Sequence, residues 1–582
     1  MSVVPDLRAL IVGARLSPEG ETHVSLRAIV AVLVLLLATG ASCRVGPEHC
    51  VPPAPTAAAW SHLGNPGLSE EPAIDVAWWT VFNDPVLDGI VARTATENFS
   101  LAAATERIAE ARAQWGVARG GLFPQGDAIA SYTRIDISDN ATPFGTVANL
   151  PPFDLWLVGL EASWELDVFG RVRRTLEAAT ADIGVAAEER RALLVILLGD
   201  VATNYVQART LQQQIQVARS NLELQAATLK LAQDRFGLGA VGELDVFQAE
   251  SNLNRTQAAI PVLERELEIT LNRLAVLQGV PPGQILPGFE EPRPVPDPPE
   301  TIAVGLPINL LRERPDVRQA ERALAAQAAR IGIATADLYP RFSLDGTFTV
   351  DATEIEDWFT GESIAYRVGP SVVWNILNFG RLQSNIAVQE ARWRQLAFEY
   401  SQTVLEASEE VENAISAYVH NREQAAELGE AVAAARRAAE LAEFQYRRGA
   451  TDFQRVLDAQ RFLTELQDEY VRAEGQVVVS VIALYRALGG GWQTPTWTTA
   501  AIPSAAEELP VPPPAFEPVA APHEQWPRDG TLPQPGPLTE EAPRSDAGPL
   551  SEMFVPAEMA VHFDGEPQSE PIGPAAEPHS FR

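Results

Sequence analysis

The chain contains Trp164-Glu165-Leu166-Asp167-Val168-Phe169-Gly170-Arg171 and repeats this pattern 210 positions later, Gly380 against Gly170, as Trp374-Asn375-Ile376-Leu377-Asn378-Phe379-Gly380-Arg381. Gly239-Ala240 returns at the same distance as Gly449-Ala450. Separate landmarks that keep one register predict an internal duplication, because chance matches would not hold register over such a length.

Each copy contains short segments in which apolar and polar residues alternate. They are Ala128–Ser138, Phe153–Asp167, Phe342–Asp351 and Tyr366–Ile376. In the first and weakest of them, the pattern places Tyr132 and Arg134 on the polar side. Strict alternation is typical of a half-buried strand. The segments are long enough for tilted transmembrane strands, which need about 9 to 11 residues, although the edge of a soluble β-sandwich would alternate in the same way.

Long helical segments follow the strand pairs. Arg171–Phe236 and Arg381–Tyr446 contain no proline and are rich in good helix formers, and at about 1.5 Å per residue each could reach roughly 100 Å. We expect partner helices at Glu243–Gln278 and Phe453–Leu488, with Gly239 and Gly449 at the tips of the two hairpins. Length and sustained amphipathic pattern together predict coiled-coil packing.

A shorter helix precedes the first strand pair. The apolar stripe that begins at Leu87 and runs to Trp115 predicts one helix, which starts after Asn83-Asp84-Pro85 and ends by Pro124.

Four strands cannot close a membrane barrel, since the smallest such barrels have about eight. An open sheet edge in lipid would leave backbone groups without hydrogen bonds, at several kcal/mol each. Strands of this kind therefore require several protomers to form one barrel.

Composition excludes several functions. Acidic residues number 77 against 44 basic ones, for a net charge of −33, which argues against binding nucleic acid. The cysteines, Cys43 and Cys50, are too close for a disulfide framework, and the seven histidines do not cluster as metal or haem ligands would. No nucleophile–base set or phosphate loop indicates an enzyme, and no cofactor is expected.

The N-terminus has the pattern of an export signal. Ile29–Ala38 is apolar but too short to span about 30 Å of hydrocarbon. Small residues Gly40-Ala41-Ser42 then precede Cys43, as in bacterial lipoprotein signals, although Gly40 stands where that signal usually has leucine. We therefore expect lipidation of Cys43, with ordinary cleavage nearby as the alternative.

The motifs in combination resemble a known family. They are Trp78-Trp79, Phe82-Asn83-Asp84-Pro85-Val86-Leu87, Leu122-Phe123-Pro124-Gln125, Trp164 through Arg171, Leu310–Glu321, Tyr446-Arg447-Arg448-Gly449-Ala450 and Val456-Leu457-Asp458-Ala459-Gln460. From Cys43 to Trp492 the chain resembles the outer-membrane factors of tripartite efflux pumps, of the TolC/NodT type. The resemblance implies a homotrimer in the outer membrane, with four strands per protomer in a twelve-stranded β-barrel that continues as a periplasmic α-helical coiled-coil barrel. It also implies an adaptor (membrane fusion) protein and an inner-membrane transporter of RND or ABC type as partners.

The resemblance further implies a gate at the periplasmic tip. Asp458 matches an aspartate of the family motif, and three copies around a threefold axis would form an acidic ring. Gln454 stands where relatives have an apolar constriction, and Arg455 stands where some have a second aspartate. Asp245 lies near the first tip, where we expect it to pair with an arginine such as Arg448 or Arg455. A solvated helix-end acid is the alternative reading of Asp458.

These observations predict a signal peptide (1–42), a lipid-anchored tether (43–82), repeat 1 (83–282), a Pro-rich linker (283–300), repeat 2 (301–491) and a disordered acidic tail (492–582). The expected function is small-molecule efflux through an outer-membrane channel. A type I protein secretion duct would share the architecture. A periplasmic coiled-coil adaptor without a pore would have one hairpin rather than two.

Overall fold

The computed structural model describes residues 44–70, 77–136, 151–284, 286–305, 307, 313–358 and 360–493. The chain divides into two compact units, residues 1–509 and 510–582. The second unit, the predicted signal peptide and Cys43 lie outside the described residues, as does the tail from residue 494 onward.

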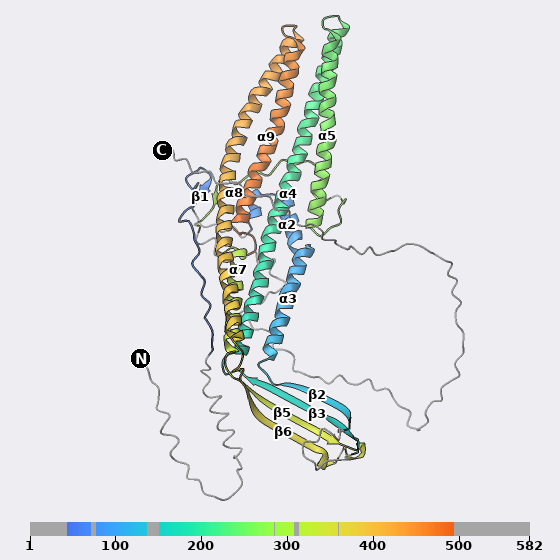
Figure 1. Ribbon diagram of the computed structural model, residues 1–582. Helices are drawn as coiled ribbons and strands as arrows, with labels where there is room; N and C mark the ends of the chain where they lie inside the picture. The colour runs from blue at the N-terminus through green and yellow to red at the C-terminus, as the bar shows by residue number, and fades with distance from the viewer. Residues whose placement is uncertain are drawn as a thin grey trace, which may run out of the picture. The chain divides into compact units, whose positions relative to one another are not determined.

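The elements of the first unit follow the predicted order of strand pairs and helical hairpins (Figure 1). The helices are α2 (Pro85–Glu97), α3 (Phe99–Gly120), α4 (Arg171–Gly237), α5 (Glu243–Leu277), α7 (Pro315–Ala336), α8 (Arg381–Arg447) and α9 (Phe453–Ala487). The strands are β1 (Leu68–Ser69), β2 (Gln125–Ile135), β3 (Phe153–Leu166), β4 (Ile302–Ala303), β5 (Arg341–Ala352) and β6 (Ile364–Val373). Short 3-10 helices lie at Trp78–Phe82 (η2), Ile355–Asp357 (η3) and Gly361–Ser363 (η4). In Figure 1 the four-stranded sheet lies at one end of the long helices and the turns of the two hairpins lie at the other.

The larger sheet is antiparallel and has the order β2-β3-β5-β6, so that β3 and β5 join the two copies. Its register corrects one prediction. Tyr132 pairs directly with Trp156, and paired residues share a face of the sheet, so Tyr132 lies on the apolar side and not on the polar side. Arg134 lies opposite Asp154 and forms an ion pair with it, at 3.2 Å. The prediction for Tyr132 was wrong because apolar and polar residues alternate only weakly along β2.

The two copies repeat the same junction between strand and helix. Trp164 donates its indole N–H to the carbonyl oxygen of Leu122 at 3.0 Å, and Trp374 donates to Leu338 at 3.0 Å. The long helices that follow, α4 and α8, have 67 residues each, and their partners α5 and α9 have 35 residues each. The two halves of the chain therefore match in the lengths of their long helices and in this hydrogen bond.

The two junctions differ in whether a side chain caps the start of the helix. The carboxylate of Asp167 accepts hydrogen bonds from the backbone N–H groups of Val172 and Arg173, at 3.0 and 2.9 Å, and thus caps α4. The corresponding position in the second copy is Leu377, which cannot accept a hydrogen bond and is 79% exposed. The start of α8 therefore lacks the side-chain cap that stabilises the start of α4.

The predicted continuous helix before the first strand is broken at Asn98. The side-chain oxygen of Asn98 accepts a hydrogen bond from the Leu101 N–H at 3.1 Å, and its amide donates to the Leu277 carbonyl at 2.9 Å. Asn98 thus ends α2, caps α3 and holds the end of α5. The prediction of one helix was wrong because the apolar stripe continues across a residue whose side chain competes for backbone hydrogen bonds.

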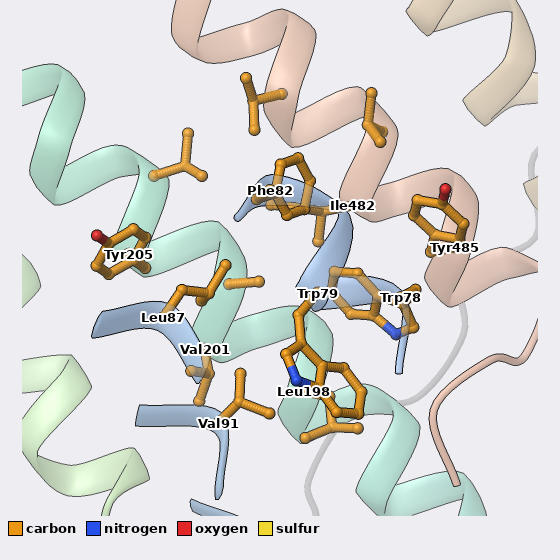
Figure 2. Close-up of a cluster of buried hydrophobic side chains, with 14 of the residues drawn as sticks. Trp78, Trp79, Phe82, Leu87, Val91, Leu198, Val201, Tyr205, Ile482 and Tyr485 are labelled. Carbon is orange, nitrogen blue, oxygen red and sulfur yellow. The ribbon is translucent and has the colours of Figure 1, made fainter. Parts of the chain in front are cut away.

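The main core lies where α2, α4 and α9 meet, partway along the helices (Figure 2). The Trp78 ring stacks on Tyr485 at 5.6 Å between centroids, and the Trp79 ring meets Trp78 edge-on at 5.8 Å. Phe82 completes η2, all three of whose apolar rings are buried. The adjacent tryptophans Trp78 and Trp79 are therefore packed in this core.

Residues Arg44–Glu70 form an extended segment, here called the N-terminal strap, that is docked on the helices and is not a free tether. The buried guanidinium of Arg174 donates to the carbonyl oxygens of Val45 and Gly46, at 3.0 and 3.1 Å. Further along the strap, Ser61 donates its backbone N–H to the Glu412 carboxylate at 3.0 Å. β1 then pairs in parallel with β4, and this fixes the end of the strap.

Replacing Gly46 by alanine should detach the start of the strap. A Cβ at this position would lie 2.4 Å from the Gly332 Cα, and Gly46 has φ of +92°, which side chains rarely adopt. We expect faster amide hydrogen exchange and new proteolytic cleavage near residues 44–50. The control is Gly64→Ala, where a Cβ would meet nothing within 4 Å and φ is not positive. Equal protection in both variants would contradict a strap held at Gly46.

Candidate functional site

The two hairpin turns have the same backbone geometry. Gly239 has φ of +69° and Gly449 has φ of +72°. The N–H groups of Gly239 and Ala240 bond to the carbonyls of Phe236 and Arg235 at 2.8 and 2.9 Å. The second turn repeats this arrangement, with N–H groups of Gly449 and Ala450 bonded at 2.9 Å each. A left-handed glycine that ends a helix in this way satisfies its last carbonyl groups.

Beneath these turns a small apolar cluster joins both hairpins. It contains Ala232 from α4, Ala249 from α5, Tyr446 from α8, and Phe453, Val456 and Leu457 from α9. The Tyr446 and Phe453 rings lie 5.3 Å apart, and Tyr446 is 1% exposed. The two tips are therefore packed against each other within one chain.

Tyr446 also provides the polar contact between the hairpins. Its hydroxyl donates to the Asp245 carboxylate at 3.1 Å, and the Arg235 guanidinium lies 4.4 Å from its ring centroid. Arg235 also donates to the Tyr446 backbone carbonyl. Burial, together with the neighbouring Asp245 charge, raises the pKa of Tyr446 to about 12, so the phenol remains a neutral donor at physiological pH.

Asp245 therefore has a different partner from the arginine that the sequence suggested. Within the chain, the Arg448 guanidinium lies over the Phe444 ring at 4.3 Å, and the Arg455 backbone N–H donates to Asp452, the N-cap of α9, at 3.2 Å. The buried phenol of Tyr446 takes the carboxylate instead. Sequence reasoning missed Tyr446 and Arg235 as site residues, although Tyr446 stands three positions before the tip glycine.

The other predicted gate residues lie exposed in the first turns of α9. The Gln454 amide donates to the Asp458 carboxylate at 2.8 Å, one helical turn apart. Asp458, Gln454 and Arg455 all face solvent within this single chain. The structure thus brings Gln454 and Asp458 together and places Asp245 in the separate contact with Tyr446.

At the other end of the chain, the sheet presents one apolar and one polar face. Exposed Leu160, Phe348, Tyr366 and Val368 lie on the apolar face. Aromatic residues gather toward both ends of the strands, with Tyr132 and Trp156 rings 4.4 Å apart near one end and Phe169 and Tyr339 rings 4.6 Å apart near the other. Apolar bands bordered by aromatic residues are typical of surfaces in contact with lipid.

The polar face of the sheet is organised around Asp345. Its carboxylate accepts hydrogen bonds from the hydroxyls of Ser163, Ser343 and Ser371, at 2.7, 2.9 and 2.6 Å, which belong to three adjacent strands. Asp345 therefore links β3, β5 and β6 through serine hydroxyls on the polar face.

Within the described ranges, the helices contain no stretch that is long and apolar enough to cross a membrane. The same part of the chain contains no group of three or more His, Cys, Asp or Glu residues placed to hold a metal ion.

Two strand pairs, each followed by a long helical hairpin, and a sheet with an exposed apolar face are the architecture of a membrane channel protein. The family model described as "Outer membrane efflux protein" matches residues 91–280 and 306–490, which is more than half of the chain. The chain belongs to this outer membrane efflux protein family.

Individual relatives agree with this assignment. Nodulation protein T of Rhizobium leguminosarum bv. viciae is 32% identical over 474 residues, which cover 81% of this chain and 95% of that protein. The pyoverdine export outer membrane protein OpmQ of Pseudomonas putida is 31% identical over 441 residues, covering 74% and 91%.

Solved structures of the same architecture are also similar. The outer-membrane channel OprN matches with a TM-score of 0.73 and 34% identity, over 78% of this chain and all of the OprN chain. CusC matches with a TM-score of 0.67 and 26% identity, over 77% of this chain. The protein is therefore an outer-membrane channel component of an efflux system, and its relatives are transport proteins and not enzymes.

Replacing Tyr446 by phenylalanine should loosen the tips while preserving the apolar packing. The change removes only the hydroxyl that bonds to Asp245, and a hydrogen bond to a charged group contributes about 1.5–3 kcal/mol. We expect faster amide exchange in both tip turns. Because the pKa of Tyr446 is raised, the contact stabilises the folded tip below pH 10 and is lost as pH rises through about 12. The control is Tyr470→Phe, whose hydroxyl bonds to Glu474 on its own helix. Equal exchange in the two variants would contradict a tip held by Tyr446.

Proposed function

We propose that this protein acts as a homotrimer whose three sheets form one twelve-stranded barrel in the outer membrane. The observation that carries the proposal is the four-stranded sheet, whose apolar face is exposed and whose outer strands are β2 and β6. In lipid, the free backbone groups of both strands need partners, and β6 of one protomer beside β2 of the next supplies them. A cyclic arrangement closes without leaving an edge.

Exposed apolar side chains on the helices support the same assembly. Phe398 on α8 is 75% exposed and Phe99 on α3 is 76% exposed, while Val117 on α3 is 81% exposed. Large apolar side chains on several helices of one chain are typical of surfaces covered by another subunit. We therefore propose that the helices of three protomers form a continuous periplasmic coiled-coil barrel.

We propose that Cys43 carries lipid. The backbone N–H of Val45 bonds to the Phe169 carbonyl at 3.3 Å, at the junction of β3 and α4. Cys43 is two positions before Val45 in the sequence, so a lipid on Cys43 would be attached close to this junction. Cys50 also has a free, exposed thiol. It lies within the docked strap, and so it is a less suitable lipid anchor than Cys43.

We propose that the channel exports small molecules together with a periplasmic adaptor and an inner-membrane transporter of RND or ABC type. The support is the relatives, which include a pyoverdine export protein and a toluene efflux pump protein. A type I secretion duct would have the same architecture. An adaptor without a pore is not favoured, because this chain has two hairpins and a four-stranded sheet.

The trimer can be tested on purified outer membranes. We expect the unheated protein to migrate as a trimer in mild detergent gels and as a monomer after boiling. In the same preparation Cys43→Ser should lose incorporation of labelled palmitate, whereas Cys50→Ser should retain it. A soluble monomer before heating would contradict the channel assembly, and palmitate retained by Cys43→Ser would contradict the anchor.

We propose that the exposed tip residues Asp458, Gln454 and Arg455 border the periplasmic entrance, with Asp245 behind them. Three Asp458 carboxylates near one axis would attract cations and repel anions over about a Debye length. Gln454 holds each carboxylate in place by its hydrogen bond.

Replacing Asp458 and Asp245 by alanine should raise single-channel conductance in planar bilayers, because it removes the hydrogen bonds to Gln454 and Tyr446 that hold the tip residues in place. The matched control is Glu469→Ala, an exposed acid on α9 away from the tip. Conductance equal to that of the control would remove the gate assignment.

A further inference from the structure

Positions in the two halves of the chain can be matched by number. α3 and α7 have 22 residues each, and α7 begins 216 positions after α3, Pro315 against Phe99. α4 and α8 have 67 residues each, and α8 begins 210 positions after α4, Arg381 against Arg171. The strands keep these two offsets, because β2 and β3 are paired in the same register as their counterparts β5 and β6.

The two halves meet at an interface that leaves a matching surface open. Inside the chain, β3 pairs with β5, and α4 packs along α7. The counterparts of β3 and α4 are β6 and α8, while those of β5 and α7 are β2 and α3. β6 and β2 are the outer strands of the described sheet. The surface of β6 and α8 therefore corresponds to one side of the inner interface, and the surface of β2 and α3 corresponds to the other.

This correspondence gives β6 a register against β2 of another protomer. Ala162 of β3 lies opposite Gly346 of β5, and their counterparts are Val372 of β6 and Ala130 of β2. Val372 and Ala130 both lie on the apolar face of the sheet. Residues that lie opposite each other share a face, so this register would keep the apolar face continuous from one protomer to the next.

An exposed aromatic ring marks the open surface. Inside the chain, the Phe169 ring, between β3 and α4, stacks on the Tyr339 ring with centroids 4.6 Å apart. Their counterparts are Phe379, which is 99% exposed, and Phe123, which is 55% exposed. Phe379 also has φ of +49°, which is an outlying value for a bulky residue. Among the described residues, the Phe379 ring therefore lacks the stacking partner that Phe169 has.

The helices of the open surface carry complementary charges. Inside the chain, α4 and α7 approach closely at Gly184, where a Cβ would lie 3.1 Å from the Cδ atom of Arg322. The counterparts of this close pair are Arg394 on α8 and Glu106 on α3, and both are exposed. Opposite charges at facing positions favour the association of two surfaces and fix their register.

We propose that the contact between protomers repeats the contact between the two halves, with β6 and α8 of one protomer against β2 and α3 of the next. This inference rests on the trimer proposed above and specifies its interface. The interface contains three pairs, each with its second residue from the next protomer: Val372 opposite Ala130, Phe379 stacked on Phe123, and Arg394 paired with Glu106. The junction between β6 and α8 is thus complete only when the neighbouring protomer supplies Phe123.

Cysteine pairs test the register in the full-length protein in outer membranes. In a Cys50→Ser background, Val372→Cys with Ala130→Cys should form a disulfide between protomers on mild oxidation. Opposite residues have Cα atoms about 4.5–5.5 Å apart, within the range of a disulfide. The matched control is Val372→Cys with Ala128→Cys, two positions along the same face, where the distance of about 7–8 Å is too long. Most of the first variant should migrate as covalent oligomers in a non-reducing gel, and the control should not.

Charge exchange gives a second measurement that needs no cysteine. Arg394→Glu and Glu106→Arg should each lower the temperature at which the trimer dissociates in detergent, because each places like charges opposite each other. The double exchange should restore the dissociation temperature, since it re-forms the pair with its charges reversed.

The outcomes separate this interface from the trimer itself. A trimer that persists without the disulfide between positions 372 and 130, or that cross-links as well through position 128, would overturn the interface and leave the trimer standing. A double exchange that does not restore the dissociation temperature would also overturn it. A monomer in the unaltered protein would overturn both proposals.

Discussion

The structure depends on the packing of apolar side chains where α2, α4 and α9 meet. A helix of 67 residues has no core of its own and gains its stability from what its faces bury. Leu198, Val201 and Tyr205 of α4 are fully buried there against the tryptophans of η2 and the apolar face of α9 (Figure 2). Between this core and the small apolar cluster beneath the tips, the contact between the hairpins includes polar pairs such as Asn221 with Gln467.

The buried polar groups near this core fix the connection between the two copies. Arg209 is fully buried and donates to the Tyr205 hydroxyl at 3.0 Å and to the Gly288 carbonyl at 2.7 Å. Arg314 donates to the Ala487 carbonyl and thereby links the start of α7 to the end of α9. Arg314 of the linker motif is therefore structural, since it satisfies a backbone group at a helix end.

The sequence was sufficient to predict the elements whose pattern is local. The starts of α4 and α8 fall at the residues expected, because a left-handed glycine precedes each one. The predictions for Asn98 and Tyr132 were wrong, because both depend on partners distant in sequence, Leu277 and Trp156. The site was predicted less completely than the fold. The position of Asp458 in the first turns of α9 could be read from the motif, but the pairing of Asp245 with Tyr446 spans 201 residues and two hairpins.

The docked strap also limits the length of chain between Cys43 and the helices. Arg174, in the first turn of α4, binds the carbonyl groups of Val45 and Gly46. Only one residue, Arg44, lies between Cys43 and this fixed contact. A lipid on Cys43 would then have a set depth relative to the sheet, counted in residues along the chain. Adding or removing one residue between Cys43 and Val45 would change how deeply the sheet enters the membrane, with no change in the sheet itself.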